Sequence, residues 1–312
     1  MASVPIMEQA KLEAGENTGA VLSIRWAPNG RHALSASKDG TVRLWNPSSG
    51  LLVRTFRASA REARDASTEP SGKRLIVASA DTQLPLVDVA SGNVLRKLRG
   101  HGPGGTHCVA FRSGDSVLAS GGFDRRLCFW DARSSSSDCV DSVLCGSDAV
   151  LCVAFPSPDS PVVHAGCADG SLVMVDVRKG KLVTDNAGGP VLSLSLSGDS
   201  ECALACVLDE HDECGVARLF DLRGGEPVAS YRGFLCRGAK VGSSLSYDDA
   251  YSLVGGEDGR IHAWELVSAK QTNEFQLFSS STTVTSLSQH PSTPSLLASG
   301  TDGTIRLLQA SE

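Results

Sequence analysis

Short runs of alternating apolar and polar residues, separated by turns, follow one another along the whole chain. The first unit has four of them, at 21–27, 32–37, 41–46 and 51–57. Alternation of this kind predicts β-strands, because successive side chains of a strand point to opposite faces of the sheet. Strands this short do not fold alone, so they must join into sheets that bury both faces against neighbours. The pattern therefore predicts an all-β protein.

The third strand of the first unit has counterparts throughout the chain. When the seven copies are aligned on the large apolar residue near their end, they lie 42 to 45 residues apart. Self-similarity at this period predicts a repeat architecture that fills nearly the whole chain. The aligned residues are Trp45, Val87, Trp130, Val175, Phe220, Trp264 and Leu308.

An aspartate precedes the aligned residue by six positions in six of the seven copies, and the fifth copy has Cys214 instead. Four of these aspartates are followed by glycine. Asp-Gly between apolar runs predicts a tight hairpin turn in which both residues have positive φ. The aspartates, which we expect in the turns of the repeats, are Asp39, Asp81, Asp124, Asp169, Asp258 and Asp302.

The third copy is the most complete, with Gly100-His101, then Ser120, Asp124 and Trp130-Asp131. This pattern, G-H … S-x-x-x-D-x-x-x-x-x-W-D, resembles the WD-repeat β-propeller family over residues from about 20 to 310. The resemblance implies a seven-bladed propeller in which His101, Ser120, Asp124 and Trp130 form a buried tetrad of hydrogen bonds. A buried imidazole and carboxylate need each other as partners. We therefore interpret the tetrad as structural and not as a catalytic dyad.

The resemblance further implies a single domain over residues 1–312. The seventh unit ends after its third strand, and residues of about 3–14 can supply the missing outer strand, so that both ends of the chain close the ring in one blade. In the second unit, Pro85 removes a backbone donor, which predicts a local distortion or an edge. We expect blades at about 18–58, 59–100, 101–146, 147–187, 188–233, 234–278 and 279–310.

Composition narrows the function classes. Residues 1–156 carry a net charge of +3 and residues 157–312 one of −9, giving −6 for the chain, which argues against non-specific nucleic-acid binding as the main activity. The ten cysteines include no C-x-x-C pair, so we expect buried, reduced thiols and no zinc site. No apolar run is long enough to cross a membrane, and no secretory signal is visible. No G-x-S-x-G, Walker A or H-E-x-x-H motif occurs, so we expect no enzyme activity, cofactor or metal.

Among WD-repeat proteins, the chain resembles the mitogen-activated protein kinase organizer family, in residues 44–56, 87–101, 256–267 and 289–297. The resemblance implies a non-enzymatic scaffold for protein–protein interactions. Its implied partners are components of kinase cascades and pre-mRNA splicing factors of the spliceosome, with no membrane and no sequence-specific nucleic acid. It also implies a monomer that works within larger assemblies in the cytoplasm and the nucleus.

Residues at the start of each inner strand should ring the mouth of the central channel, where a partner could bind. Arginine is favoured at interface hot spots, because its planar fork pairs with carboxylates. Solvated loop charges are an equally good interpretation of each position. The candidate partner-binding residues are Arg61, Glu62, Arg64, Thr106, His107, Arg237 and Lys240.

Two further hypotheses remain open. The W-D-x-R box of cullin–RING ubiquitin ligase substrate receptors is matched by residues 130–133, where Asp131 and Arg133 would contact an acidic adaptor. An acidic insert at 209–213 could hold a metal through Asp209, His211 and Asp212. A solvated hairpin tip is the simpler interpretation of that insert, because a hard cation needs more converging oxygens than such a tip offers.

Overall fold

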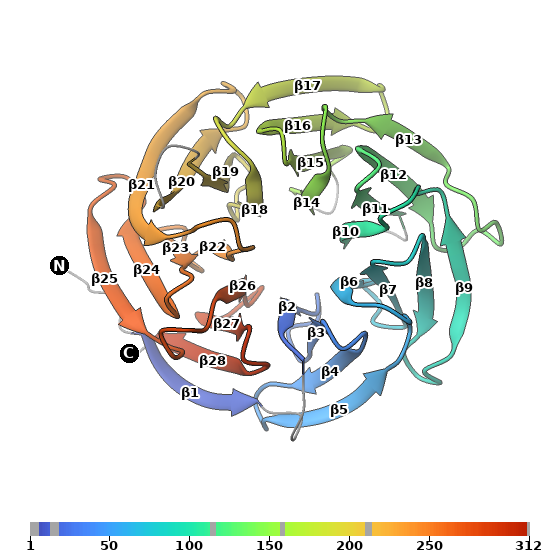
Figure 1. Ribbon diagram of the computed structural model, residues 1–312, viewed down its shortest axis with the longest axis horizontal. Helices are drawn as coiled ribbons and strands as arrows, with labels where there is room; N and C mark the ends of the chain where they lie inside the picture. Colours follow the sequence, from blue (N-terminus) through green and yellow to red (C-terminus); the bar gives the residue numbers. More distant parts are fainter. Residues whose placement is uncertain (1–5, 13–18, 113–116, 157–159, 210–213, 311–312) are drawn as a thin grey trace.

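Seven four-stranded antiparallel sheets stand around a central channel in the computed structural model (Figure 1). The structure describes residues 6–12, 19–112, 117–156, 160–209 and 214–310, and these contain strands and turns but no helix. In every sheet, the first strand of the blade lines the channel and the last lies at the rim. The seven-bladed all-β propeller is thus confirmed.

The blades share one order of strands, from the channel outward. Blade 1 holds β2 (Val21–Trp26), β3 (Ala33–Ser37), β4 (Val42–Asn46) and β5 (Leu51–Phe56); blade 2 holds β6 (Ala63–Thr68), β7 (Arg74–Ser79), β8 (Gln83–Asp88) and β9 (Val94–Arg99). Blade 3 holds β10 (Thr106–Phe111), β11 (Val117–Gly122), β12 (Arg126–Asp131) and β13 (Asp141–Leu144); blade 4 holds β14 (Val150–Ala154), β15 (Val162–Cys167), β16 (Ser171–Asp176) and β17 (Lys181–Asn186). Blade 5 holds β18 (Val191–Leu196), β19 (Cys202–Leu208), β20 (Cys214–Asp221) and β21 (Pro227–Leu235); blade 6 holds β22 (Ser243–Leu245), β23 (Tyr251–Gly255), β24 (Arg260–Glu265) and β25 (Gln271–Gln276). Blade 7 holds β26 (Val284–Gln289), β27 (Ser295–Gly300), β28 (Ile305–Ala310) and, as its outer strand, β1 (Ile6–Leu12).

Blade 7 closes the ring with both ends of the chain. Strand β1 runs antiparallel to β28, from Ile6 opposite Ala310 to Leu12 opposite Ile305. The Leu12 side chain is 1% exposed and lies in a cluster with Ile24 and Leu307. The first strand of the chain therefore covers the edge of the last, as the strand count predicted.

The Asp-Gly turns differ from the expected geometry. In the first blade, Gly40 has a φ of 81°, but Asp39 is not among the residues with positive φ. The Asp39 carboxylate accepts a 2.9 Å hydrogen bond from the N–H of Thr41 instead. The prediction of two residues with positive φ was wrong: the aspartate holds the turn through its side chain. The same bond, to the N–H two residues on, is made by Asp124, Asp169, Asp258 and Asp302.

Blade 2 keeps four strands despite its proline. Strand β8 pairs with β7 only from Arg74 opposite Asp88 to Ile76 opposite Leu86, and the ladder stops just before Pro85. The corresponding ladder of blade 3 has five pairs. Because proline has no N–H to donate, it shortens one ladder without ending the strand, which is the local distortion that the sequence predicted.

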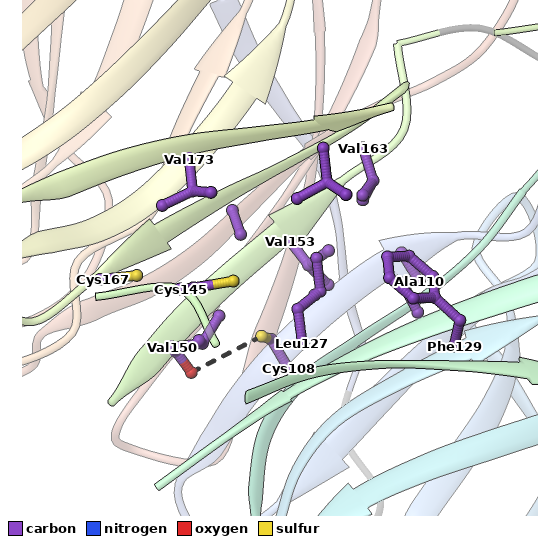
Figure 2. Close-up of a cluster of buried hydrophobic side chains, with 13 residues drawn as sticks. Cys108, Ala110, Leu127, Phe129, Cys145, Val150, Val153, Val163, Cys167 and Val173 are labelled. Atoms are coloured by element: carbon purple, nitrogen blue, oxygen red, sulfur yellow. Dashed lines mark hydrogen bonds between the residues drawn. The ribbon is translucent and has the colours of Figure 1, made fainter. Parts of the chain in front are cut away.

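Apolar side chains from neighbouring blades meet in the spaces between sheets. Figure 2 shows the cluster between blades 3 and 4, where Leu127 and Phe129 face Val153 and Val173. Cysteines serve as small apolar residues here: Cys145 is buried, and burial raises the pKa of its thiol to about 11. All ten cysteines are free thiols. This packing makes the ring a rigid frame for the channel.

Candidate functional site at the channel mouth

Six inner strands begin with a β-bulge, and the bulge decides which side chain faces the channel mouth. The ladder to the second strand skips one residue in each of these blades. A bulge changes the direction in which the side chain of the extra residue points, so that it no longer follows the regular alternation between the two faces of the sheet. The skipped residues are Leu22, Arg64, His107, Leu151, Leu192 and Thr285.

Five of the six skipped residues line one cavity of about 280 Å³, which we call the mouth pocket. Thr285 is the exception, because its hydroxyl is buried and donates to the Val21 carbonyl oxygen at 2.6 Å. The lining of the mouth pocket is completed by three residues outside the bulges, Glu62, Gly238 and Lys240. Four predicted candidates are thus brought together here, namely Glu62, Arg64, His107 and Lys240.

The mouth pocket is lined by apolar and charged residues. Three leucines reach it from blade 1 and, across the channel, from blades 4 and 5. Beside Leu22, in blade 2, an Arg64 guanidinium nitrogen lies 2.7 Å from a Glu62 carboxylate oxygen, and another donates to the Gly104 carbonyl oxygen at 3.1 Å. The same guanidinium stands 4.9 Å from the ring centre of Phe123, which is 45% exposed. Arg64 is therefore held in place before any partner arrives.

His107 contributes an uncharged imidazole to the mouth pocket. Burial lowers its pKa to about 4, and the positive charges of Arg64 and Lys240 act in the same direction. Its ring lies 4.1 Å from the ring of Phe123, between centres. Its Nε2 atom is buried and has no hydrogen-bond partner among the described residues. At neutral pH, His107 therefore lines the pocket with a polar but uncharged side chain.

Below the mouth pocket, an ion pair joins the neighbouring blades 1 and 2, between the buried Asp65 and Arg25, whose side chain is 36% exposed. The Arg25 guanidinium donates to both carboxylate oxygens of Asp65, at 3.0 and 2.7 Å. The same carboxylate accepts from the Ser23 hydroxyl at 2.7 Å and from the Val109 N–H of blade 3 at 3.1 Å. Asp65, which is 1% exposed, therefore ties three blades together.

The ionisation of Asp65 follows from this environment. Burial raises the pKa of its carboxyl group, but the charges of Arg25 and Lys240 and the hydrogen bonds from Ser23 and Arg25 outweigh burial. The net result is a pKa below the usual range, so Asp65 is ionised at neutral pH. The channel cavity that it lines measures about 150 Å³ and also contains Arg25 and Lys240.

Three of the predicted partner-binding residues lie outside the mouth pocket. Thr106 is fully buried and bonds with the backbone of Ser79, so its side chain is not available to a partner. Arg61 lines an outer cavity of about 550 Å³, and its guanidinium lies 3.9 Å from Asp81. The backbone N–H of Arg237 donates to a Glu257 carboxylate oxygen at 2.6 Å. Sequence reasoning found the right strand ends and two of the bulge residues, Arg64 and His107, but it missed the three leucines.

The tetrad of blade 3 is one chain of hydrogen bonds. The Trp130 indole N–H donates to the Ser120 hydroxyl at 2.9 Å, and Ser120 lies 2.8 Å from Nε2 of His101. The opposite nitrogen, Nδ1, lies 2.9 Å from an Asp124 carboxylate oxygen. An ionised carboxylate can only accept, so Nδ1 carries the proton and Nε2 accepts from Ser120. Every member is engaged inside the blade.

Replacing Ser120 with alanine should lower the free energy of unfolding by about 2–4 kcal/mol. The change leaves two buried groups unpaired, the Trp130 indole N–H and His101 Nε2, and each costs about 1–3 kcal/mol. Ser35→Ala in blade 1 is the matched control, since among the described residues the Ser35 hydroxyl accepts a side-chain hydrogen bond only from the Trp45 indole, at 2.9 Å. Urea unfolding of the two variants measures the difference. Equal losses would contradict a tetrad that acts as a unit.

Comparison with known proteins places this repeat in a family. The model described as "WD domain, G-beta repeat" matches residues 9–46, 92–131, 137–176 and 271–308, together half of the chain. The chain belongs to the WD40 repeat family. Each matched segment runs from an outer strand to the third strand of the next blade, which is the same offset that brings β1 to β28.

Several WD40 proteins are similar to the chain over nearly its full length. WD repeat domain-containing protein 83 of Rattus norvegicus is 31% identical to this chain, and the match covers 94% of this chain and 89% of the rat protein. The protein of the same name from Xenopus tropicalis is 33% identical, and the match covers 96% of this chain and 91% of the frog protein. The WD repeat domain-containing protein 83 homolog of Dictyostelium discoideum is 26% identical over 95% and 96%. The likeness covers the whole ring and not one blade.

The two remaining hypotheses gain no support in this WD40 protein. Arg133 binds within its own turn, since its backbone N–H and its guanidinium both donate to Asp131, and the family match says nothing of a cullin adaptor. Of the acidic insert, His211 and Asp212 lie outside the described residues, and Asp209 accepts from Arg232 at 3.1 Å. The part of the chain that the structure describes holds no group of three or more His, Cys, Asp or Glu placed to bind a metal. Nor does it hold a helix long and apolar enough to cross a membrane.

Proposed function

We propose that this WD40 protein is a non-enzymatic scaffold that binds protein partners at its channel mouth. One observation carries the proposal: the bulges gather Arg64, His107 and three leucines into one pocket, beside the exposed ring of Phe123. An exposed aromatic residue next to a fixed arginine has the composition of an interface hot spot. Because the propeller is rigid, such a surface is ordered before the partner binds, which reduces the entropy lost on association.

The identity of the partners is proposed from the resemblance to the organizer family. We propose components of kinase cascades and pre-mRNA splicing factors, bound by a single copy of the chain in the cytoplasm and the nucleus. Family membership supports the coarser statement, that the chain is a protein-interaction scaffold. The proposed partners include neither a membrane nor a nucleic acid bound in a sequence-specific way.

Affinity purification of tagged Phe123→Ala and wild-type protein from nuclear and cytosolic extracts, with mass spectrometry, tests the proposal. We expect the variant to recover a defined set of partners at least tenfold less than the wild type does. Splicing factors should be in the nuclear set and kinase-cascade components in the cytosolic set. Val267→Ala is the matched control, because Val267 is an apolar residue, 94% exposed, in the turn between β24 and β25. Equal recovery by all three proteins would contradict partner binding at the mouth.

A further inference from the structure

We infer that the mouth pocket binds a partner segment in which a large apolar side chain lies next to a carboxylate. The inference rests on the proposed function and names the chemistry of the bound segment. It starts from the charges around the two adjoining cavities. The mouth pocket and the channel below it share Leu151, Leu192 and Lys240, so a side chain that enters the mouth meets the groups of both.

The charges of these cavities do not cancel. Three cations line them, Arg25, Arg64 and Lys240, against the two carboxylates Glu62 and Asp65. Both carboxylates are already bound by arginines, Asp65 by Arg25 and Glu62 by Arg64. His107 is neutral, since burial lowers its pKa to about 4. One positive charge is therefore left over.

Lys240 carries that charge. It forms no ion pair or hydrogen bond with another described residue, and it acts on Asp65 and His107 only through its electric field. It is half-buried at the junction of the two cavities. An ammonium group in such a place gains most from an ionised acceptor, because charge-assisted hydrogen bonds are stronger than neutral ones.

A carboxylate fits this site better than a phosphate group. A phosphate brings a charge of about −2 and three acceptor oxygens, which are normally met by two or more cations or by several backbone donors. Here the arginines are committed to Glu62 and Asp65, so one lysine remains. A single negative charge balances it. A basic segment would instead place like charges beside Lys240 and Arg64.

The apolar half of the segment is specified by the leucines of the mouth pocket. Leu22, Leu151 and Leu192 reach the mouth pocket from three different blades. A cavity of about 280 Å³ lies near the lower limit of small-molecule pockets, which suits one large side chain more than a whole cofactor. A leucine or phenylalanine seated there would place the carboxylate of an adjacent residue near Lys240.

Fluorescence anisotropy with three labelled peptides and the full chain tests the inference. The acidic probe alternates leucine with glutamate, the basic probe has lysine for glutamate, and the polar probe has serine for leucine. We expect the acidic probe to bind at least tenfold more tightly than either of the others, with an affinity that falls as salt is added. A fourth peptide, with phosphoserine for glutamate, should bind no better than the acidic probe.

Two variants connect this binding to the pocket. Lys240→Glu should weaken the acidic probe at least tenfold, and Leu151→Ala should weaken it while leaving the salt dependence unchanged. Lys181→Glu is the matched control, with the same change of charge on the rim strand β17. Circular dichroism melts verify that each variant is folded.

The inference is overturned if the acidic and basic probes bind equally, if the phosphoserine peptide binds more tightly than the acidic probe, if Lys240→Glu has no effect, or if the acidic probe fails to bind at about 1 mM. In any of these cases, loss of partners by Phe123→Ala would still support the proposed function. If Phe123→Ala retains its partners, on the other hand, the proposed function is contradicted even if the probes bind. The two failures are therefore distinguishable.

Discussion

Deletion of residues 1–15 should lower the free energy of unfolding by about 5 kcal/mol or more. The deletion removes β1, and with it the ladder to β28 and the buried side chain of Leu12. Each backbone hydrogen bond contributes about 0.5–1.5 kcal/mol and the leucine about 1.5–3 kcal/mol. The strand β28 also becomes a free edge, which favours aggregation. Thermal melts and size-exclusion chromatography measure both effects.

The control for this deletion stops short of β1. Removal of residues 1–5 should leave the melting temperature within about 2 °C of the full chain, since a change of about 1 kcal/mol moves it by only a few degrees in a domain of this size. A synthetic peptide of residues 1–15 should restore part of the stability of the longer deletion by pairing with β28 again. An unchanged melting temperature after the longer deletion would show that blade 7 does not need its outer strand.

Replacement of Asp65 with asparagine should cost about 2–4 kcal/mol, because it weakens several hydrogen bonds to a buried charge, each worth about 1.5–3 kcal/mol, while the Arg25 side chain, which is 36% exposed, stays partly solvated. The change leaves the Arg25 guanidinium without its carboxylate and weakens the acceptor of Ser23 and of the Val109 N–H. Urea unfolding measures the loss. Arg61→Ala is the control, because it removes only an exposed contact of 3.9 Å with Asp81, which should be worth less than about 1 kcal/mol.

The pH dependence of stability tests the same pair. Because the pKa of Asp65 is lower in the folded protein, its ionised form stabilises the fold above the unfolded pKa of about 3.9. That contribution is lost as the pH falls through the folded pKa. The wild type should therefore lose stability below about pH 4 more steeply than Asp65→Asn. Parallel pH profiles would show that the ion pair adds little to the fold.

Much of the ring could be predicted from the sequence, because repetition multiplies weak signals. A single Asp-Gly or a lone short strand predicts little, but seven copies at a period of 42 to 45 residues define the number of blades. Ring closure followed from a simple deficit, one outer strand missing in the seventh unit. The tetrad could be recognised because one blade carries all of its members, which the structure joins by hydrogen bonds.

The channel mouth was harder to predict, because its geometry depends on a shift of register. Leu151 and Leu192 continue the apolar alternation of their strands, and nothing in that alternation shows that a bulge turns them into a pocket. The Arg25–Asp65 pair joins residues 40 positions apart, in two blades that only the ring brings together. The inner strand of blade 2 is unusually polar, at 61–67, but nothing in the sequence indicates which residue of blade 1 pairs with it.

The position of β1 also has a consequence for biosynthesis. Strand β1 is made before the other strands of the ring, but its partner β28 is made roughly 300 residues later, which takes about 15–60 s at ordinary rates of translation. During that time the inner blades can form one after another, because each sheet apart from the seventh is continuous in the chain. The ring itself stays open until β28 has been made. Any chain that stops before β28 exposes both unpaired edges, so incomplete products differ from finished ones in a form that chaperones and proteases can recognise.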